Sequence, residues 1–500
     1  MERLFFLLQS EKQFDRQVRI LTYLDMIQTS VSSTELARVV GCTTPTLRGD
    51  IKAINLNFPK ELKIIAHTDS DGYKLASPKG ISIFSYLMEI AQNTIVFQII
   101  DNILHNRILS FQQAIDELYL SKSVLRKTIN HMNTVLKSFN ISISTINIDF
   151  IGDESDIRYF LYVFYADFRD YFVVNNKLDA QDETYGEILN TSKNFNYPRI
   201  HLGYFRSTIW IMILAERLLH KHYVSLDMEL IKEIQDRDSF KEHTKFFGAA
   251  LSKVFGLASL PLEEHIWSYI VALHCISYTD PDRTLKDNDT TEYVYRREES
   301  EEVIKQVDTF LELELCSTLM NQKQIEKIRS YLINLRLLSK LTPQFERVSF
   351  PLSNFMKESL NGFYNKWRLQ LEQNDTKLLY PIQYKKDVAV TLSMLHFSML
   401  DSLHIRDVNV LFSFQGESGY DEFLVQTTRL LVTENIHASY IFEKSITLNM
   451  IQELKADLVV CNYDPPGVQD SPVRIVRLSY IPSAVEWTVL RDILVELSKL

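Results

Sequence analysis

Two segments of the chain, 78 residues apart, place hydroxyl and cationic side chains in the same order. Thr43–Ile51 reads TTPTLRGDI and Ser121–Ile129 reads SKSVLRKTI. The hydroxyl groups at the start of each segment favour a helix N-terminus, because they accept hydrogen bonds from its free amides. The shared Leu-Arg-x-x-Ile predicts a helix that buries leucine and isoleucine and exposes arginine. An arginine exposed in this way can bind a guanine edge or a DNA phosphate.

The two segments therefore predict DNA-recognition helices, and eight side chains on them are candidate DNA contacts. These are Thr44, Thr46, Arg48, Lys52, Lys122, Ser123, Arg126 and Lys127. The ordinary alternative is a solvated arginine on a three-helix core, and the repetition of the pattern favours DNA contact over it. The second segment is more basic, so we expect it to contribute more phosphate binding.

The residues around the first segment predict the rest of a winged helix-turn-helix. Residues 14–27 are apolar at helical spacing, and residues 33–40 predict a short helix that ends at Gly41. Residues 64–67 and 72–75 predict two strands joined by an Asp-Ser-Asp-Gly turn.

The same order of elements returns after residue 90. Helices are predicted at 94–106 and 111–118, followed by the second recognition helix at 123–139. Residues 141–148 alternate like a single strand, and Gly152-Asp153 predicts its turn.

From about residue 155 to 400 the pattern is helical, with a second repeat at an offset near 123 residues. Residues 206–210 (RSTIW) resemble 329–333 (RSYLI), and residues 268–274 resemble 390–396, each ending in histidine. Two copies of one helical bundle fit this repetition. The charged stretch 279–300 predicts a solvated linker between them.

After about residue 405 strands and helices alternate. Strands are predicted at 408–413, 438–442, 457–461 and 473–476, and helices at 423–432 and 486–497. This order predicts a small α/β domain of ordinary size.

Composition limits the class of protein. The chain has 500 residues, enough for three to five domains, and a formal net charge of -10. The charge is uneven, since residues 105–140 hold five basic and two acidic residues, a net of +3, whereas residues 280–314 have a net of -7. The acidity argues against nonspecific coating of nucleic acid, and the basic segments allow local DNA binding.

No pattern in the sequence indicates catalysis or a cofactor. The four cysteines are scattered, which argues against disulfides and a metal site and favours a reducing compartment. We see no apolar stretch of membrane-spanning length and no signal-peptide core, so we expect a cytoplasmic protein without a membrane partner. Nucleophile, phosphate-loop and zinc-protease motifs are missing from the sequence, so an enzyme is not expected.

The order of these segments resembles the Mga-type virulence regulators of Gram-positive bacteria over essentially the whole chain. The resemblance implies a mainly α-helical, multidomain protein: two winged helix-turn-helix domains, two helical PTS regulation domains and a C-terminal α/β domain like the EIIB component of the sugar phosphotransferase system (PTS). The corresponding segments are 1–78, 79–165, 166–285, 286–402 and 403–500.

The resemblance also implies a cytoplasmic transcription activator that senses sugar uptake through phosphorylated histidines. The matching positions are His201, His274 and His396, whereas Gln324 stands where the second repeat would match His201. The C-terminal domain departs from a working EIIB, because residues 414–419 (FQGESG) contain no cysteine to carry phosphate. We therefore expect this domain to serve docking or dimerisation.

The sequence is compatible with three interpretations of the function. The first is a sequence-specific DNA-binding regulator that binds double-stranded DNA as a homodimer or higher oligomer and receives phosphate from PTS phosphocarrier proteins. Dimers are expected because helix-turn-helix proteins gain affinity from two half-sites. The second is a phosphotransfer or docking protein of the PTS without DNA binding, and the third is a helical scaffold without a ligand.

Overall fold

The computed structural model describes most of the chain. The described residues are 4–27, 29–57, 63–67, 72–76, 87–88, 91–108, 110–168, 186, 203–256, 260–276, 298–315, 322–348, 350–374, 378, 380–400, 406–415, 419–429, 435–442, 444–465, 468 and 471–498. They are mainly helical and fall into two compact units, Met1–Leu395 and His396–Leu500. Almost all of the predicted linker at 279–300 lies outside the described residues.

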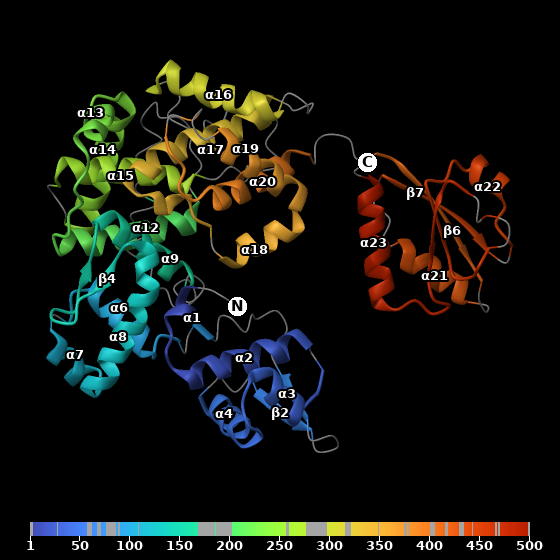
Figure 1. The fold of residues 1–500 in the computed structure, drawn as a ribbon, viewed down its shortest axis with the longest axis horizontal. Helices are drawn as coiled ribbons and strands as arrows, with labels where there is room; N and C mark the ends of the chain where they lie inside the picture. Colours follow the sequence, from blue (N-terminus) through green and yellow to red (C-terminus); the bar gives the residue numbers. More distant parts are fainter. Residues whose placement is uncertain are drawn as a thin grey trace. The chain divides into compact units, whose positions relative to one another are not determined.

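The first three-helix module is followed by a small antiparallel sheet (Figure 1). Its elements are α2 (Lys12–Ile27), β1 (Val31–Ser32), α3 (Ser33–Val40), α4 (Thr44–Asn57), β2 (Lys63–His67) and β3 (Gly72–Ala76). The strand order β1-β3-β2 confirms the predicted hairpin and adds a short strand ahead of α3. Ser32 begins α3 by accepting a hydrogen bond from the Glu35 amide, and Gly41 ends it with φ 74°.

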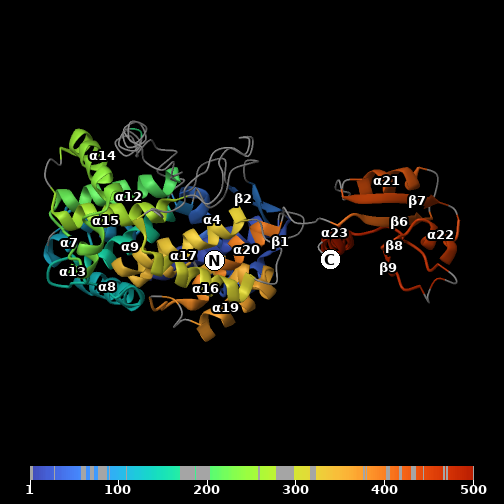
Figure 2. The ribbon, with the colours of Figure 1, turned by 90° about the horizontal axis from the view of Figure 1, so that it is seen from above.

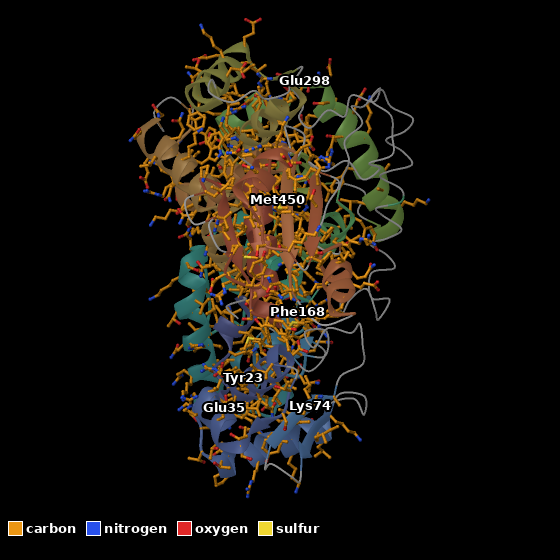
Figure 3. The ribbon with its side chains drawn as sticks, turned by 90° about the vertical axis from the view of Figure 1, so that its right-hand side faces the viewer. Tyr23, Glu35, Lys74, Phe168, Glu298 and Met450 are labelled. Atoms are coloured by element: carbon orange, nitrogen blue, oxygen red, sulfur yellow. The ribbon has the colours of Figure 1, made fainter. Side chains whose placement is uncertain are left out.

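Side chains of α2 and α3 hold the two helices in a fixed relation. The Tyr23 hydroxyl on α2 donates a hydrogen bond to Glu35 on α3 over 3.3 Å, and both residues are labelled in Figure 3. Beneath them Leu21, Leu24 and Leu36 are buried. The apolar spacing that predicted these helices is therefore the spacing of the core they share.

The second module repeats the helices with a smaller hairpin. Its elements are α6 (Ile95–Leu104), α7 (Phe111–Glu117), α8 (Lys122–Leu136), the short 3-10 helix η1 (Lys137–Phe139), β4 (Ser142–Ile143) and β5 (Phe150–Ile151). Ser110 and Ser121 cap α7 and α8, and the cap at Ser121 is the one that the sequence predicted. The hairpin tip lies against α7, because the Phe111 amide donates to the Ile146 carbonyl over 3.3 Å.

The prediction of one strand across 141–148 is wrong, because the chain reverses inside this segment. The Ser144 hydroxyl accepts hydrogen bonds from the amides of Ile146 and Asn147, and such local bonds compete with a strand ladder. Gly152 does not form the predicted turn either. A Cβ there would lie 2.7 Å from Cγ2 of Ile141, so this glycine allows a close approach of two chain segments.

Helix α9 (Glu154–Ala166) and the N-terminal α1 (Leu4–Leu8) pack onto the second module. Phe5 of α1 lies 5.1 Å from Phe168, which lies 4.8 Å from Phe97 of α6, measured between ring centroids. Phe160 and Phe164 of α9 are fully buried in the same core. The aromatic side chains of α9 therefore serve core packing.

The helical part of the first unit repeats its elements. It comprises α12 (Tyr204–Leu219), α13 (Met228–Ile234), α14 (Asp238–Phe255), α15 (Leu262–Cys275), α16 (Glu301–Leu315), α17 (Gln322–Leu341), η3 (Pro343–Glu346), α18 (Phe350–Ser359), α19 (Asn361–Asn374) and α20 (Lys385–Leu400). The starts of α14 and α19 are 123 residues apart, as are those of α15 and α20. Helices α12 and α15 lie side by side in two views (Figures 1 and 2).

Ion pairs join the two sets of helices. Glu299 accepts hydrogen bonds from Arg237 and from Arg336 of α17, each over 2.8 Å. Glu233 of α13 bonds Arg336 over 2.5 Å and Lys340 over 2.6 Å. The first and second repeats are therefore parts of one packed body.

The second unit is a parallel sheet with helices on both faces. Its elements are β6 (Val408–Phe414), α21 (Tyr420–Arg429), β7 (Ile436–Phe442), α22 (Leu448–Glu453), β8 (Leu458–Cys461), β9 (Arg474–Arg477) and α23 (Ala484–Ser498). The strand order is β7-β6-β8-β9 and every pair is parallel. Leu424 of α21 and Leu490 of α23 pack on one face, and Ile451 of α22 packs on the other. The predicted α/β order is confirmed.

Candidate nucleic-acid interface

Helix α4 has the buried and exposed sides that the sequence predicted. Leu47 and Ile54 are fully buried and Ile51 nearly so. Arg48 and Lys52 are exposed, as is Thr46, whereas Thr44 is half-buried. Thr43 begins the helix, because its hydroxyl lies 2.9 Å from that of Thr46 and accepts from the Thr46 amide. The cationic side of α4 is thus open to a partner.

Helix α8 presents the corresponding surface in the second module. Leu125 and Ile129 are fully buried. The four predicted contacts on this helix are all exposed: Lys122, Ser123, Arg126 and Lys127. The Arg126 guanidinium lies 5.8 Å from the ring centroid of Phe111 on α7, a position that orients the arginine without burying it.

An ion pair that the sequence analysis missed holds α4 on α2. Arg16 donates from Nε to Asp50 over 2.6 Å and from a second nitrogen over 3.2 Å. Asp50 is 3% exposed, so this two-bond pair fixes α4 from its buried side. The corresponding residues of the second module are Thr94 and Thr128, which cannot form such a pair. An acidic residue at a buried helical position was the signal for it.

An asparagine joins each recognition helix to its hairpin. Asn55 donates to the Ile64 carbonyl over 3.0 Å and accepts from the Ile64 amide over 2.8 Å. Asn133 makes the same two bonds with Ile143, over 3.0 and 2.7 Å. The two asparagines are 78 residues apart, so the repeat offset already contained this signal. Two side-chain hydrogen bonds therefore join each recognition helix to its hairpin.

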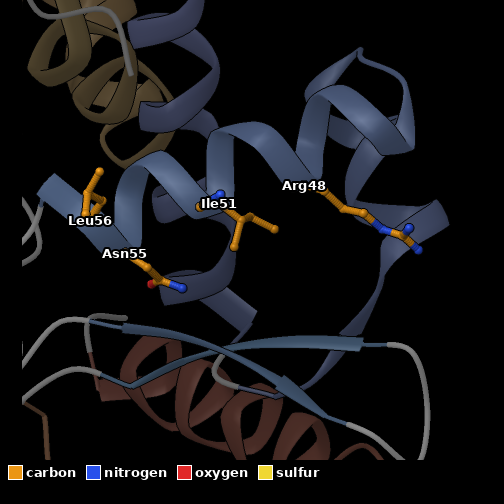
Figure 4. Close-up of a pocket in the computed structure, with 5 residues that line it drawn as sticks. Arg48, Ile51, Asn55 and Leu56 are labelled. Atoms are coloured by element: carbon orange, nitrogen blue, oxygen red, sulfur yellow. The ribbon is translucent and has the colours of Figure 1, made fainter.

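A shallow hollow lies on α4 on the side that carries its cations (Figure 4). It is lined by Arg48, Ile51, Lys52, Asn55 and Leu56. Leu56 is 81% exposed although it is apolar. The hollow combines two positive charges with an apolar floor, which suits a sugar–phosphate chain better than a buried small molecule.

His274, a predicted phosphorylation site, lies in an aromatic enclosure. The Trp210 indole donates to its Nδ1 over 3.0 Å, so the ring is neutral and carries its proton on Nε2. Tyr162 and Phe345 lie 4.9 and 5.2 Å from the ring, measured between centroids. Burial, together with the charge of Arg206, lowers the pKa of His274 to about 3.

The other predicted phosphorylation sites differ in their surroundings. His396 lies on α20 and is 2% exposed. His201 lies outside the described residues, and Gln324 lies on α17. Of the three histidines, His274 and His396 belong to the described residues, and each lies in a different unit of the chain.

A buried cluster of charges links α9 to the first helical repeat. Arg158 of α9 is fully buried and donates two hydrogen bonds to Glu264 of α15, over 2.8 and 3.0 Å. Glu154, at the start of α9, accepts from Arg158 over 2.9 Å and from Arg217 of α12 over 2.8 Å. Burial opposes ionisation of Glu154, but the arginines outweigh it and hold its pKa below the usual value.

The segment around η3 joins the second repeat to the end of α8. Arg347 donates to the Ser138 carbonyl over 2.9 Å, and its guanidinium lies 4.6 Å from the Phe139 ring centroid. Phe345 lies 5.0 Å from Tyr159 of α9, between centroids, and the Thr342 hydroxyl bonds Asp156. The segment around η3 therefore contacts α9 and also η1, which directly follows the recognition helix α8.

The loop after β6 is positioned by an amide side chain. Asn462 donates to the Gln415 carbonyl over 2.8 Å and accepts from its amide over 2.9 Å. Cys461, the cysteine nearest in the fold, is buried in β8, and burial raises the pKa of its thiol. That thiol is poorly suited to carry phosphate at this loop.

Among the described residues, no three acidic, histidine or cysteine side chains gather as a metal site would require. None of the described helices is long and apolar enough to cross a bilayer.

Comparison with known proteins agrees with a regulator. Residues 79–165, which contain α6 to α8 and all but the last residue of α9, match the Mga helix-turn-helix domain family. The capsule synthesis positive regulator AcpA of Bacillus anthracis is 23% identical over 73% of this chain and 77% of its own length. A putative trans-acting regulator of Streptococcus pneumoniae serotype 4 is 23% identical, over 49% of this chain and 48% of its own length. The probable licABCH operon regulator of Bacillus subtilis is 24% identical, over 47% and 40%.

Two helix-turn-helix modules with exposed cationic recognition helices define a transcription regulator rather than an enzyme. Residues 79–165 match the Mga helix-turn-helix domain family, and the three similar regulators support the Mga-type regulators as the family that this chain resembles.

Proposed function

We propose that the chain is a cytoplasmic, sequence-specific transcription activator that binds duplex DNA through α4 and α8. The observation that carries this proposal is the repeated recognition helix, with its serine or threonine start and its exposed arginine at the same position in both modules. Arg48 and Arg126 would bind guanine edges or phosphates, and the lysines beside them would bind phosphates. The other candidate contacts, Thr44, Thr46 and Ser123, lie on the same two helices.

The test uses the whole 500-residue chain. Helix α9 shares its core with the helical repeats, so a chain cut near residue 165 would expose the buried side of α9. We compare a variant with Lys122, Arg126 and Lys127 changed to alanine against a charge-matched control. In the control Lys221, Lys232 and Lys245, which are exposed on the helical repeats, become alanine.

A labelled duplex is titrated with each protein across a salt series. We expect the α8 variant to lose affinity and its salt dependence to fall by about 0.9 in logarithmic slope for each phosphate contact removed. The control should bind like the wild type. Equal binding by both variants, or none by the wild type, would contradict DNA binding through α8. Transfer of phosphate without DNA binding would instead favour a PTS docking protein.

We infer that phosphorylation by PTS phosphocarrier proteins tunes this activity at His201, His274 and His396. His274 supports the regulatory part of the proposal, since it touches both Trp210 of α12 and Phe345 of η3. A phosphate adds nearly two negative charges to a ring enclosed by aromatic side chains, so η3 would have to leave. The proposed readout is a change in the homodimer or higher-oligomer equilibrium, with the EIIB-like C-terminal unit as the dimer surface.

This regulation is tested by incubating the protein with the general phosphotransfer proteins. We expect acid-labile phosphate on the wild type, less on the His274→Ala variant, and a change of mass in light scattering. A Phe345→Ala variant removes the ring that covers His274 from η3. It should therefore accept phosphate faster than the wild type. Absence of acid-labile phosphate from both the wild type and this variant would remove the proposal and leave DNA binding standing.

A further inference from the structure

The turn between α7 and α8 contains a tyrosine in a conformation that favours glycine. Tyr119 has a φ of 53°, in the left-handed region. Gly41, 78 positions earlier, lies between α3 and α4 with a φ of 74°. Both modules therefore require this conformation at the turn. The first module meets it with the residue that adopts it most easily, and the second does not.

The tyrosine side chain does not compensate for this strain by packing. Tyr119 is 94% exposed, more than any other large apolar or aromatic side chain found exposed in the described part of the chain. Among the described residues, none forms a hydrogen bond, ion pair or ring contact with it. A strained residue that contributes nothing to the core points to a role outside folding.

The neighbours of Tyr119 indicate the partner. Ser121, two residues later, caps α8, and the exposed Lys122 and Arg126 follow on that helix. The free amides of the first helical turn and these cations attract phosphate. Tyrosine hydroxyl groups are among the side-chain groups that bind DNA phosphates and fix the position of a protein on a duplex.

We propose that Tyr119 binds the sugar–phosphate backbone of duplex DNA at the edge of the groove that α8 enters. The inference rests on the proposed DNA binding by α8 and adds a contact that carries no charge. The hydroxyl donates a hydrogen bond to a phosphate oxygen, and the ring covers the adjacent sugar. The second module thus retains the strained turn for binding, whereas the glycine of the first module makes no such contact.

The experiment compares full-length wild type with Tyr119→Gly and Tyr119→Phe. A labelled duplex of mixed sequence and about 40 base pairs, long enough for several half-sites, is titrated at several salt concentrations. We expect Tyr119→Gly to bind about fivefold more weakly at every salt concentration, with an unchanged salt slope because no charge is lost. Tyr119→Phe should lose part of this affinity. The melting temperature of Tyr119→Gly should equal or exceed that of the wild type.

Asn106→Gly is the matched control, since Asn106 is exposed, has a φ of 51° and lies at the end of α6. It should bind like the wild type. Wild-type affinity in Tyr119→Gly would overturn the inference, as would a fall in its melting temperature, which would indicate a folding role. Loss of self-association in place of DNA affinity would do the same. If the wild type itself fails to bind, the proposed function fails first.

Discussion

Arg48 and Arg126 occupy the same position in the two modules but have different surroundings. Arg48 belongs to a helix that an ion pair between Arg16 and Asp50 fixes on α2. Arg126 belongs to a helix without that pair and lies over the Phe111 ring. Its helix also carries two exposed lysines, so more positive charge surrounds it. The same motif is thus expected to contribute unequally to binding.

We expect Arg126→Ala to weaken duplex binding more than Arg48→Ala does. The reason is the denser positive charge on α8. The lysines beside Arg126 attract further phosphates, so we expect this helix to contribute more to binding. Loss of an arginine that contacts a base costs about 1–3 kcal/mol of binding free energy. A gel-shift titration at fixed salt measures both variants, and an equal loss in the two would refute the ranking.

Glu264→Leu should destabilise the first unit by about 3–5 kcal/mol, because it leaves the buried Arg158 with an incomplete set of partners. Urea unfolding measures the change. The double variant Arg158→Met with Glu264→Leu should recover much of this loss, since no uncompensated charge then remains. A double variant as unstable as the single one would show that packing, and not charge, determines the effect.

At the scale of elements, the hairpins depend on the helices that precede them. Asn55 and Asn133 each bond both backbone groups of one isoleucine in the hairpin. The second hairpin has only two residues in each strand, so its asparagine contributes a larger share of its bonds. Its position therefore depends on α8 more than on its own ladder.

We expect Asn133→Ala to loosen residues 141–151 while the helices stay folded. Two hydrogen bonds are lost, at a cost of about 1–3 kcal/mol in stability, and the hairpin backbone should exchange amide hydrogen faster. Hydrogen exchange with mass spectrometry measures this. Asn130→Ala is the matched control, because Asn130 is exposed on the same helix. Equal exchange in the two variants would contradict the role of Asn133.

The sequence predicted those elements whose signals lie within a few residues of each other. Capping hydroxyls and Gly41 predicted α3, α4 and α8, because these signals act within one turn of helix. Strand β1 could not be predicted, since two residues have no period. The pair Arg16–Asp50 joins residues 34 positions apart, and its partner choice depends on how two helices pack. The hairpin after α8 was missed because its alternation fits both one strand and two.

At the scale of the whole molecule, the first unit is one continuous core from the second module to the second repeat. Helix α9 contacts α1 with its aromatic side and α12 and α15 with its charged end. The segment around η3 adds contacts with Ser138 and Phe139. Changes in the helical repeats can therefore reach α8 without passing through a flexible joint.

Acid should destabilise this unit through two histidines, His243 and His274, whose pKa values are lowered in the folded chain. Burial lowers the pKa of His243 and of His274 to about 3, from the ordinary value of 6.5. The unfolded chain takes up these protons below about pH 6.5, whereas the folded chain does so only near pH 3. Stability that is fully present above pH 6.5 is therefore lost as pH falls, by about 1.4 kcal/mol per pH unit for each histidine.

The measurement is urea unfolding at about pH 7 and about pH 5 for the wild type and His243→Gln. The variant should show the smaller difference between the two conditions. Comparing variants isolates the histidine, because burial raises the pKa of Asp156 and Glu346 and gives these carboxyl groups the opposite pH dependence. An unchanged difference would mean that His243 is accessible to protons in the folded chain.

Helix α9 packs against both the second module and the first helical repeat. This limits where two related regulators can be joined into a chimera. A chimera joined after residue 165 would combine the Arg158 of one parent with the Glu264 position of another, and would inherit a mismatched interior. A crossover placed before Leu87 would transfer the first helix-turn-helix module together with α1, and would keep Arg158 with its own Glu264. Recombination between paralogues, in the laboratory or in genomes, is therefore expected to succeed at the earlier junction. Such a chimera would exchange the proposed DNA contacts of the first module and keep those of the second.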